Sequence, residues 1–509
     1  MALSESPFFV FSAIVAAIVG VLWLIRAALQ AGHRPASLPP GPPTVPIFGN
    51  ELQIPKAHAH FQFMKWAHEY GGIFSLKRFK NTTIVISDRK LIKELVDKKS
   101  NVYSHRPASL VSHLITHSDH LLVMQYGDTW RMLRKIVHQF FMEPNCEKEH
   151  WKVQEAEASQ MLYDFLTSPG DHMLHPKRYS NSITNSLVFG IRSKTVRDEY
   201  MEKLFALMEK WSLVQELGAT PPVDDFKLLR MLPQWMLGNW RNRALEVENL
   251  MQSLYSTVLN QVRDRRTKGV YRDSFMDRVL DKLEKTPLSE SQLRFLGGAL
   301  TKFPAVQARA HAEIDRVVGS ERSPGWADFA ELPYINCMIK EAHRWRPVSP
   351  LGVPHAVAQD DYLNGMLLPK GSTIVLNVWA IHHDPSIYPN PERYEPSRFE
   401  EYPSLAPTYA ASGAEHRDHY GYGAGRRICP GIHLAERNLF IAIAKLLWAF
   451  EFTQPTGSSS DIDPESGASQ GFLHCPKDYG CGVRLRSPEK GETIVREFRE
   501  AREVFERFD

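Results

Sequence analysis

The stretch from Tyr420 to Gly431 constrains the fold of this chain more than any other, because it presents one cysteine on a glycine-rich loop. Arginines precede Cys429, and an apolar periodicity from Gly431 to about Phe450 predicts an amphipathic helix directly after it. Free backbone N–H groups and the positive end of a helix dipole favour the thiolate form of a cysteine in this position. The alternative is an inert, buried cysteine beside a glycine turn.

The same loop resembles a known signature. Residues 422–431 are similar to the pattern F-x-x-G-x-R-x-C-x-G of the cytochrome P-450 haem-thiolate monooxygenases. The positions that match are Gly425, Arg427, Cys429 and Gly431. The one departure is Tyr422, where the family usually has Phe, so an aromatic ring is kept. The resemblance implies haem b as the cofactor, with the Cys429 thiolate as axial ligand of the iron and the rest of the loop around it.

Composition narrows the class of protein. With 509 residues and 43% hydrophobic residues, the chain is long enough for a large core. A net charge of +3 argues against a nucleic-acid-binding protein. The five cysteines are scattered and form no CxxC pair, which argues against a disulfide framework or a structural zinc site. A reducing, cytosol-facing compartment fits this pattern best.

The N-terminus predicts a membrane anchor. The run from Pro7 to Ile25 has no charge, and as a helix it extends about 28 Å, close to the ~30 Å hydrocarbon core of a bilayer. Arg26 and Arg34 follow it, so the positive-inside rule leaves the bulk of the chain in the cytosol. We therefore predict a single-pass endoplasmic reticulum anchor in residues 1–34 and a proline-rich hinge in residues 35–50, similar to those of microsomal family members.

The remaining pattern indicates one mainly helical domain. Strand-like alternation appears between Gly72 and Ser87, and β-rich pieces return near 353–376 and 472–486. The stretches with helical periodicity are 128–142, 150–168, 198–217, 245–267 and 274–285. This order predicts a mainly α fold with small β-sheets, as the resemblance to the cytochrome P-450 fold implies, and not a repeating α/β fold. The predicted haem-thiolate domain covers residues 51–488, and a charged C-terminal tail covers 489–509.

Two further segments resemble haem-binding parts of the family. Trp130 and Arg134 are similar to its W-x-x-x-R helix; they share one helix face, so both can reach a haem propionate. His355 falls where the family often has a propionate-binding cation. The alternatives are a core tryptophan with a surface arginine, and a strand histidine with ordinary partners. Arg131 and Lys135 lie elsewhere on the same helix and are candidates for a basic patch that receives an acidic reductase.

Three charged residues resemble a structural motif of the family. Glu341 and Arg344 match E-x-x-R on a predicted helix, where an i, i+3 spacing allows an ion pair. Buried charges need all their donors and acceptors satisfied, so a third partner is expected. Arg398 resembles that partner, and together the three would hold the irregular segment that carries Cys429.

One part of the family pattern is missing. Leu288–Leu300 resembles the first third of the helix that crosses the distal face of the haem, but Thr301–Gln307 already resembles its end and the next helix. The motif [AG]-G-x-[DE]-T-[TS], whose acid–Thr pair delivers protons, is absent after Leu300, so no catalytic residue is predicted there. By comparison with the family, about 20 residues, or roughly 30 Å of helix, are lacking.

Three accounts of this gap stay open. The sequence can be a gene model or splice form that lost an exon. It can be a haem-thiolate protein that has given up oxygen activation. In the third account, a different segment does the distal work.

The resemblance implies a function. The expected enzyme is a monooxygenase that inserts one oxygen atom of O2 into a small apolar or aromatic substrate, with electrons from an NADPH–cytochrome reductase. Segments Gly352–Phe399 and Arg426–Gly431 resemble fungal members of secondary-metabolite clusters, notably those that hydroxylate phenolic polyketides in patulin-type pathways. The expected pocket lining is Ser104–Met124 and Gly471–His474, with Phe472 and Leu473 near the haem. The alternatives are a haem-thiolate isomerase or dehydratase, and a catalytically inactive haem or ligand binder.

Overall fold

Helices dominate the computed structural model, which describes residues 7–216, 218–281, 308–453, 472–474 and 480–508. Each of the five stretches with helical periodicity contains a helix, so the mainly helical fold is confirmed. The helices Ala59–Tyr70, Leu110–Thr116, His175–Phe189 and Pro488–Glu500 are not among those stretches. In chain order the α-helices are α1 (Pro7–Ala31), α2 (Ala59–Tyr70), α3 (Arg89–Leu91), α4 (Leu110–Thr116), α5 (Asp128–Phe141), α6 (Glu143–Asn145), α7 (Trp151–Thr167), α8 (His175–Phe189), α9 (Glu199–Gln215), α10 (Trp240–Thr267), α11 (Phe275–Asp281), α13 (Ala308–Val317), α14 (Pro333–Trp345), α15 (Val378–His382), α16 (Ala406–Ala410), α17 (Ile432–Ala449), α18 (Pro488–Glu500) and α19 (Arg502–Phe505).

The strands of the described residues form three small sheets. They are β1 (Ile73–Arg78), β2 (Asn81–Ile86), β3 (His355–Ala356), β4 (Asp361–Leu363), β5 (Met366–Leu368), β6 (Thr373–Leu376), β7 (Phe450–Thr453) and β8 (Gly482–Leu485). The largest sheet has the order β1-β2-β6-β3, in which the predicted hairpin β1–β2 pairs in parallel with β6 through Ile84 and Ile374. This sheet therefore joins the N-terminal part of the chain to the segment that contains His355.

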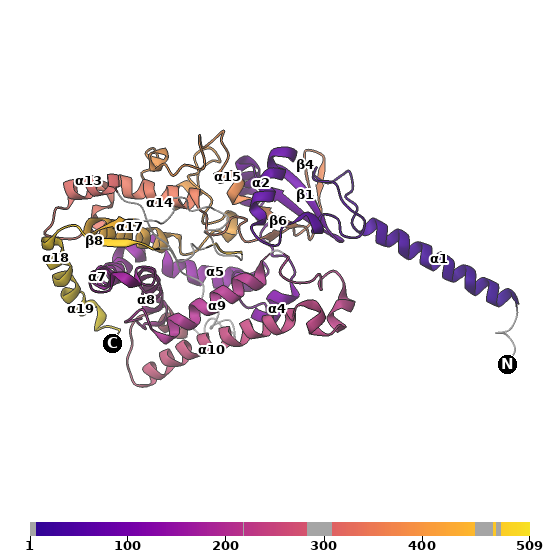
Figure 1. The fold of residues 1–509 in the computed structure, drawn as a ribbon. Helices are drawn as coiled ribbons and strands as arrows, with labels where there is room; N and C mark the ends of the chain where they lie inside the picture. The colour runs from indigo at the N-terminus through magenta and orange to yellow at the C-terminus, as the bar shows by residue number, and fades with distance from the viewer. Residues whose placement is uncertain (1–6, 217, 282–307, 454–471, 475–479, 509) are drawn as a thin grey trace.

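The sheet and the main group of helices lie at opposite ends of the globule (Figure 1). The β1–β2 sheet and α2 lie beside α1, whereas α7, α8, α17 and α18 lie at the far end. Helix α17 packs against α7, α13 and α14, and most of its side chains are buried. A helix that is apolar on all sides belongs in a core. The end of the cysteine loop is thereby attached to a helix that lies mostly in the core.

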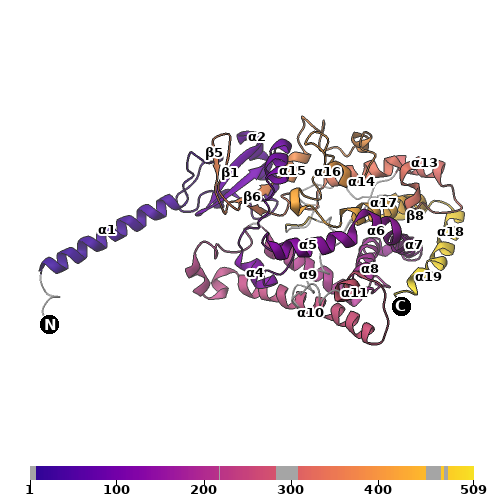
Figure 2. The same ribbon diagram turned by 180° about the vertical axis from the view of Figure 1, so that it is seen from behind.

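The N-terminal helix α1 projects away from the globule in both views (Figures 1 and 2). Its apolar side chains are exposed, with Phe11 at 65% and Trp23 at 66%. Among the residues that the structure describes, no helix is long and apolar enough to cross a membrane, so the predicted transmembrane helix is not supported. The proline-rich hinge contacts the sheet through Ser75 of β1. The Ser75 N–H donates to the Pro40 carbonyl (2.7 Å), and its Oγ–H donates to the Pro39 carbonyl (2.6 Å).

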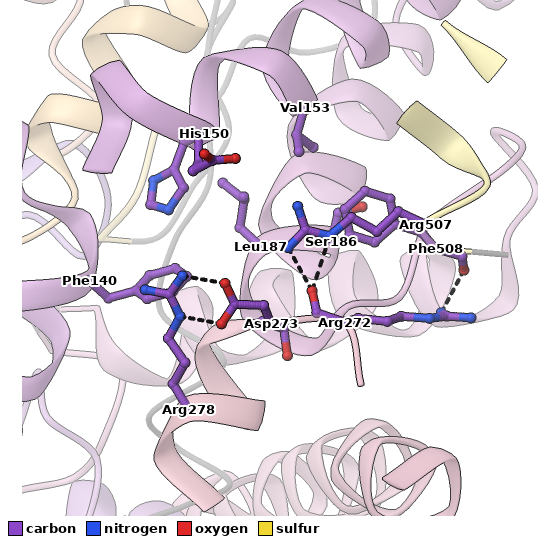
Figure 3. Close-up of a pocket in the computed structure, with 12 residues that line it drawn as sticks. Phe140, His150, Val153, Ser186, Leu187, Arg272, Asp273, Arg278, Arg507 and Phe508 are labelled. Atoms are coloured by element: carbon purple, nitrogen blue, oxygen red, sulfur yellow. Dashed lines mark hydrogen bonds and ion pairs between the residues drawn. The ribbon is translucent and has the colours of Figure 1, made fainter. Parts of the chain in front are cut away.

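The segment predicted as a charged C-terminal tail is packed against the globule instead. Helices α18 and α19 lie on α7, where Ile494 and Phe505 are buried. Figure 3 shows how the end of the chain is held: Arg272 donates to the Phe508 carbonyl (2.6 Å), and Arg507 donates back to the Arg272 carbonyl (2.7 Å). The cavity between them is about 30 Å³, room for about one water molecule, which is too small for a substrate.

Candidate functional site

Cys429 lies on a tight loop between a short 3-10 turn, Gly425–Arg427, and helix α17. Its backbone N–H donates to the Tyr422 carbonyl (2.9 Å), and the Gly423 N–H donates to the Tyr420 carbonyl (2.9 Å). These bonds close the loop on itself. The position of the sulfur is therefore set by backbone hydrogen bonds.

Gly425 explains why this loop needs glycine. Its φ of +61° is left-handed, and a Cβ built there would lie 2.4 Å from the Val96 carbonyl oxygen. Its N–H donates to Asp97 Oδ1 (2.8 Å). The loop is thus held against the segment before residue 98, and a larger residue at this position would push the two apart.

The protonation of Cys429 differs from the prediction. Burial raises the pKa of the thiol above its ordinary value, and two groups oppose this effect: the Gly431 N–H and the guanidinium of Arg134. The expectation that the loop by itself favours a thiolate is therefore wrong, because desolvation of the sulfur outweighs both stabilising groups. A metal cation bound to the sulfur supplies the charge that the protein alone lacks, since ligand thiols bind deprotonated.

A group of cationic side chains lies beside the loop. Arg427 donates to three backbone carbonyls: those of Ser104 (2.9 Å), Leu121 (3.1 Å) and Met124 (2.6 Å). Its guanidinium lies 4.2 Å from the centre of the Trp130 ring. The Trp130 indole N–H also donates to the Leu121 carbonyl (3.1 Å). Trp130 and Arg427 thus share one wall of the site.

Arg134 and His355 complete the predicted set. Arg134 comes from α5, donates to the Ile428 carbonyl next to Cys429, and lies 5.9 Å from the Trp130 ring. His355, on β3, is buried, and its Nδ1 lies 2.7 Å from the Tyr103 carbonyl. Burial, together with the nearby Arg106 and Arg427, lowers the pKa of His355 to about 3. The structure therefore brings the four predicted side chains into one region: Trp130 and Arg134 of α5, His355 of β3 and Arg427 of the cysteine loop.

Arg106 is a member of this group that the sequence analysis did not single out. It is only 6% exposed and donates to the carbonyls of Val353 (2.8 Å), Pro354 (2.6 Å) and Leu122 (2.8 Å). Burial lowers its pKa to about 9. An arginine inside the predicted pocket stretch 104–124 was the available signal.

This group, called the cationic cluster, consists of the guanidinium groups of Arg106, Arg134 and Arg427 together with the neutral imidazole of His355, and over the described residues it has no acidic partner. In the part of the chain that the structure describes, no Asp or Glu carboxylate lies within 4.0 Å of any of the four side chains. Burial first, and then repulsion from Arg106 and Arg134, lowers the pKa of Arg427 to about 8. Buried like charges of this kind require an anion, and the two carboxylates of haem provide one that fits. The thiol and the cationic cluster are thus the donor set that haem needs.

The structural trio also assembles. Glu341 and Arg344 from α14 are fully buried and paired, and Arg398 Nε lies 3.5 Å from Glu341 Oε1. Arg344 further donates to the carbonyls of His382 (3.0 Å) and Pro391 (2.8 Å). The pair therefore ties α14 to the irregular segment that precedes the cysteine loop.

Comparison with known protein families matches residues 39–297 and 291–481 to "Cytochrome P450". The chain belongs to the cytochrome P450 family. It is 81% identical to the cytochrome P450 monooxygenase acuD of Aspergillus aculeatus, with all of both chains covered. It is also 74% identical to patI of Aspergillus clavatus (96% of each chain) and 70% identical to patI of Penicillium expansum (98% of each chain), which are both named cytochrome P450 monooxygenases.

Family membership settles the general chemistry. P450 proteins hold a haem iron through an axial cysteine thiolate, and the monooxygenases among them use a small-molecule substrate, O2 and a redox partner. The protein is therefore an oxidoreductase of this type with haem as its cofactor. The orphan cationic cluster beside the cysteine loop agrees with this cofactor.

Tyr422, the departure from the P450 signature, has polar partners of its own. Its hydroxyl donates to Glu436 Oε1 (2.7 Å) and lies 3.2 Å from His343 Nε2. Burial raises the pKa of Glu436, and the Tyr422 hydroxyl acts in the opposite direction. The hydroxyl that Phe lacks is thus satisfied inside the protein, and it links the loop to α17 and α14.

Two elements were predicted for the distal side of the haem: the pair Phe472 and Leu473, and the partial helix Leu288–Leu300. Phe472 and Leu473 are half-buried, and their N–H groups donate to Ser212 of α9 (3.4 and 3.1 Å). The Phe472 ring lies 6.5 Å from that of Trp211. The predicted partial helix Leu288–Leu300 falls outside the described residues.

The gap after Leu300 can be compared with the relatives at the level of the sequence. The two P450 matches overlap at residues 291–297, which lie within the stretch Leu288–Leu300 that resembles the first third of the distal helix. The alignment with acuD runs over 529 positions and covers all 509 residues of this chain, so at least 20 positions have a residue in the relative alone.

Proposed function

We propose that this protein hydroxylates a small apolar or aromatic substrate with O2 and with electrons from an NADPH–cytochrome reductase. The observation that carries the proposal is the cysteine loop beside a buried cationic cluster for which the described residues offer no acidic partner. When bound, haem supplies the oxygen-activating chemistry. The protein supplies the ligand, the orientation and a dry surrounding.

The residues of the site divide into one iron ligand and a group that binds the haem carboxylates. Cys429 would provide the thiolate that holds the haem iron. Arg106, Arg134 and Arg427, with the neutral imidazole of His355 as a further hydrogen-bonding group, would hold the two haem carboxylates, and the ring of Trp130 lies near the guanidinium groups of Arg134 and Arg427. Because the arginines are already bonded to backbone carbonyls, little side-chain freedom would be lost when the carboxylates bind.

The substrate that we propose is a phenolic polyketide of a fungal secondary-metabolite pathway. The support is the resemblance of Gly352–Phe399 and Arg426–Gly431 to family members with such substrates, together with the apolar Phe472 and Leu473 in the predicted lining. A ring of this size suits a mainly apolar pocket with few polar groups.

We also propose that the gap after Leu300 is a lost exon in a gene model or splice form. The meeting of two family matches at 291–297 and the 20 unmatched positions against acuD support this account. The absent acid–Thr pair leaves one competing function, a haem-thiolate isomerase or dehydratase that needs neither O2 nor reductase. It also leaves a catalytically inactive haem binder.

We propose further that the protein works at the cytosolic side of the endoplasmic reticulum membrane. The support is an exposed apolar surface beside α1. It includes Leu52 (71% exposed), Leu228 (78%), Met231 (83%) and Trp235 (75%). The aromatic contacts Phe48–Phe79 (5.8 Å) and Phe79–Phe226 (5.1 Å) join the segment after α1 to the segment that carries Trp235.

The functions are separated by measuring NADPH consumption with reductase against product formed from a panel of phenols. The monooxygenase consumes NADPH and O2 in proportion to hydroxylated product. An isomerase or dehydratase forms product without either reagent. An inactive haem binder forms no product. If the protein that is tested contains the missing segment, product without NADPH and O2, or no product at all, contradicts the proposal.

A further inference from the structure

Three histidines from distant parts of the chain meet at the start of α2. His58 immediately precedes the helix, His60 is in its first turn, and His474 lies on the described stretch 472–474. One ring nitrogen of each lies within 4.8 Å of those of the other two. The His474 N–H donates to the Val348 carbonyl (2.7 Å), so the backbone holds this residue beside the other two.

The three rings pack edge to face and are not stacked on one another. The rings of His58 and His474 are perpendicular with centres 5.3 Å apart, and those of His60 and His474 meet at 73° with centres 4.9 Å apart. Edge-to-face packing leaves the ring nitrogens at the edges of the cluster's contacts, where the distances between them allow a shared ligand.

The backbone at His58 produces this arrangement. Its φ of 53° is left-handed, which is uncommon for a residue other than glycine. Residues i and i+2 of a regular helix do not face each other. The turn at His58 therefore brings its ring next to that of His60, with centres 5.9 Å apart.

Two nitrogens of the cluster are free to act as ligands. Over the described residues, His58 Nδ1 and His60 Nε2 are buried and have no hydrogen-bond partner. His60 is only 2% exposed. Buried polar groups are almost always hydrogen-bonded, so two such nitrogens in one cluster point to a ligand.

The chemical nature of the three side chains selects the class of metal. Imidazole nitrogens suit zinc, copper and nickel, whereas magnesium and calcium require oxygen ligands.

We propose that His58, His60 and His474 form a zinc site outside the haem centre, with the fourth position open to water. Zinc bonds three imidazole nitrogens at about 2.0–2.1 Å, which places them about 3.3 Å from one another. The three nitrogens, now within 4.8 Å of one another, would have to move closer together to bind the ion. Because His474 follows Phe472 and Leu473 directly, bound zinc would fasten the predicted substrate wall to α2.

The test is zinc binding by the full 509-residue chain, measured by competition with a chromophoric chelator in metal-free buffer. The variants are His58→Asn, which keeps a residue that tolerates left-handed backbone, and His474→Gln. The matched control is His68→Asn, an exposed histidine on the same helix. Circular dichroism establishes that each variant is folded.

We expect the wild type and His68→Asn to bind one zinc ion with the same affinity, and the other two variants to bind at least tenfold more weakly. X-ray absorption at the zinc edge should show three imidazole nitrogens at about 2.0–2.1 Å. Equal affinity in all four proteins, or a shell made mainly of oxygen, would overturn the proposal.

Discussion

Glu341 and Arg344 form a two-pronged ion pair in which neither side chain is exposed. Arg344 Nε lies 2.6 Å from Glu341 Oε2, and Nη2 lies 2.7 Å from Oε1. Arg344→Ala leaves Glu341 buried without its main partner, which costs roughly 3–5 kcal/mol. Since a domain is stable by only about 5–15 kcal/mol, we expect apoprotein or aggregate, measured by haem content and gel filtration.

The matched control is Lys203→Ala on α9. Lys203 and Glu199 also form an ion pair, at 2.6 Å, but both side chains are exposed. The loss of such a pair changes the free energy of unfolding by no more than about 1 kcal/mol. An Arg344→Ala protein with full haem occupancy and only a slower rate would contradict the structural role.

Arg106 provides a second prediction, on haem retention. Arg106→Gln removes one buried cation of the cluster but keeps a donor for the Val353 carbonyl. A charged hydrogen bond contributes roughly 1.5–3 kcal/mol, so haem should leave the variant about ten- to a hundredfold faster. The measurement is haem transfer to an excess of apomyoglobin. Arg131→Gln, an exposed residue of α5, serves as the control and should lose haem at the wild-type rate.

Much of this site could be predicted from the sequence. The cysteine loop, the E-x-x-R pair and the Trp130–Arg134 helix are local patterns, and the structure places them as local geometry allows. The partners of Arg106 could not be predicted, because Val353 and Pro354 are far away from it in the sequence. The pKa of Cys429 was predicted in the wrong direction, because the pattern reveals the nearby N–H groups but not the burial of the sulfur.

The C-terminal end of the chain also shows that a sequence pattern does not reveal burial. High charge in residues 489–509 predicts a tail, yet Lys490 lies 2.8 Å from Asp315 and Ile494 is fully buried. A charged helix can bury one apolar side, and only the packing partner reveals it. The three-histidine cluster was missed for a similar reason, since His474 is remote in sequence from His58 and His60.

Membrane association is tested by removing the first 34 residues. The shortened chain should move from the microsomal pellet toward the soluble fraction and keep its capacity for haem, because the haem site lies in the globule. The exposed surface around Trp235 should leave some residual binding to vesicles. Protection of the globule from protease in sealed microsomes would overturn the proposed cytosolic orientation.

The gap is tested on the messenger RNA. Leu288–Leu300 alone would give only about 20 Å of helix, too short to cross a haem. Amplification across codons 300 and 301 should therefore reveal an in-frame insert of about 60 nucleotides that encodes an acid followed by Thr-Thr or Thr-Ser, in keeping with ~1.5 Å of helix per residue. A transcript without the insert, whose protein still couples NADPH to product, would defeat this account.

The chain as it stands is expected to bind haem weakly, or to bind it and release electrons as peroxide. Each fully buried apolar side chain lost from the distal helix removes roughly 1.5–3 kcal/mol. We expect the gap to lower the amount of haem bound and to leave the cysteine side of the site unchanged, because Cys429 lies on a separate segment. The identity of the axial ligand can therefore be measured in the 509-residue chain.

The most direct test is the reduced carbon monoxide spectrum of the wild type and of Cys429→Ser. A thiolate opposite carbon monoxide moves the Soret band to unusually long wavelength, and serine does not. We predict the long-wavelength band in the wild type and its loss in Cys429→Ser. If Cys429→Ser keeps that band, or if wild-type protein with bound haem lacks it, Cys429 is not the axial ligand.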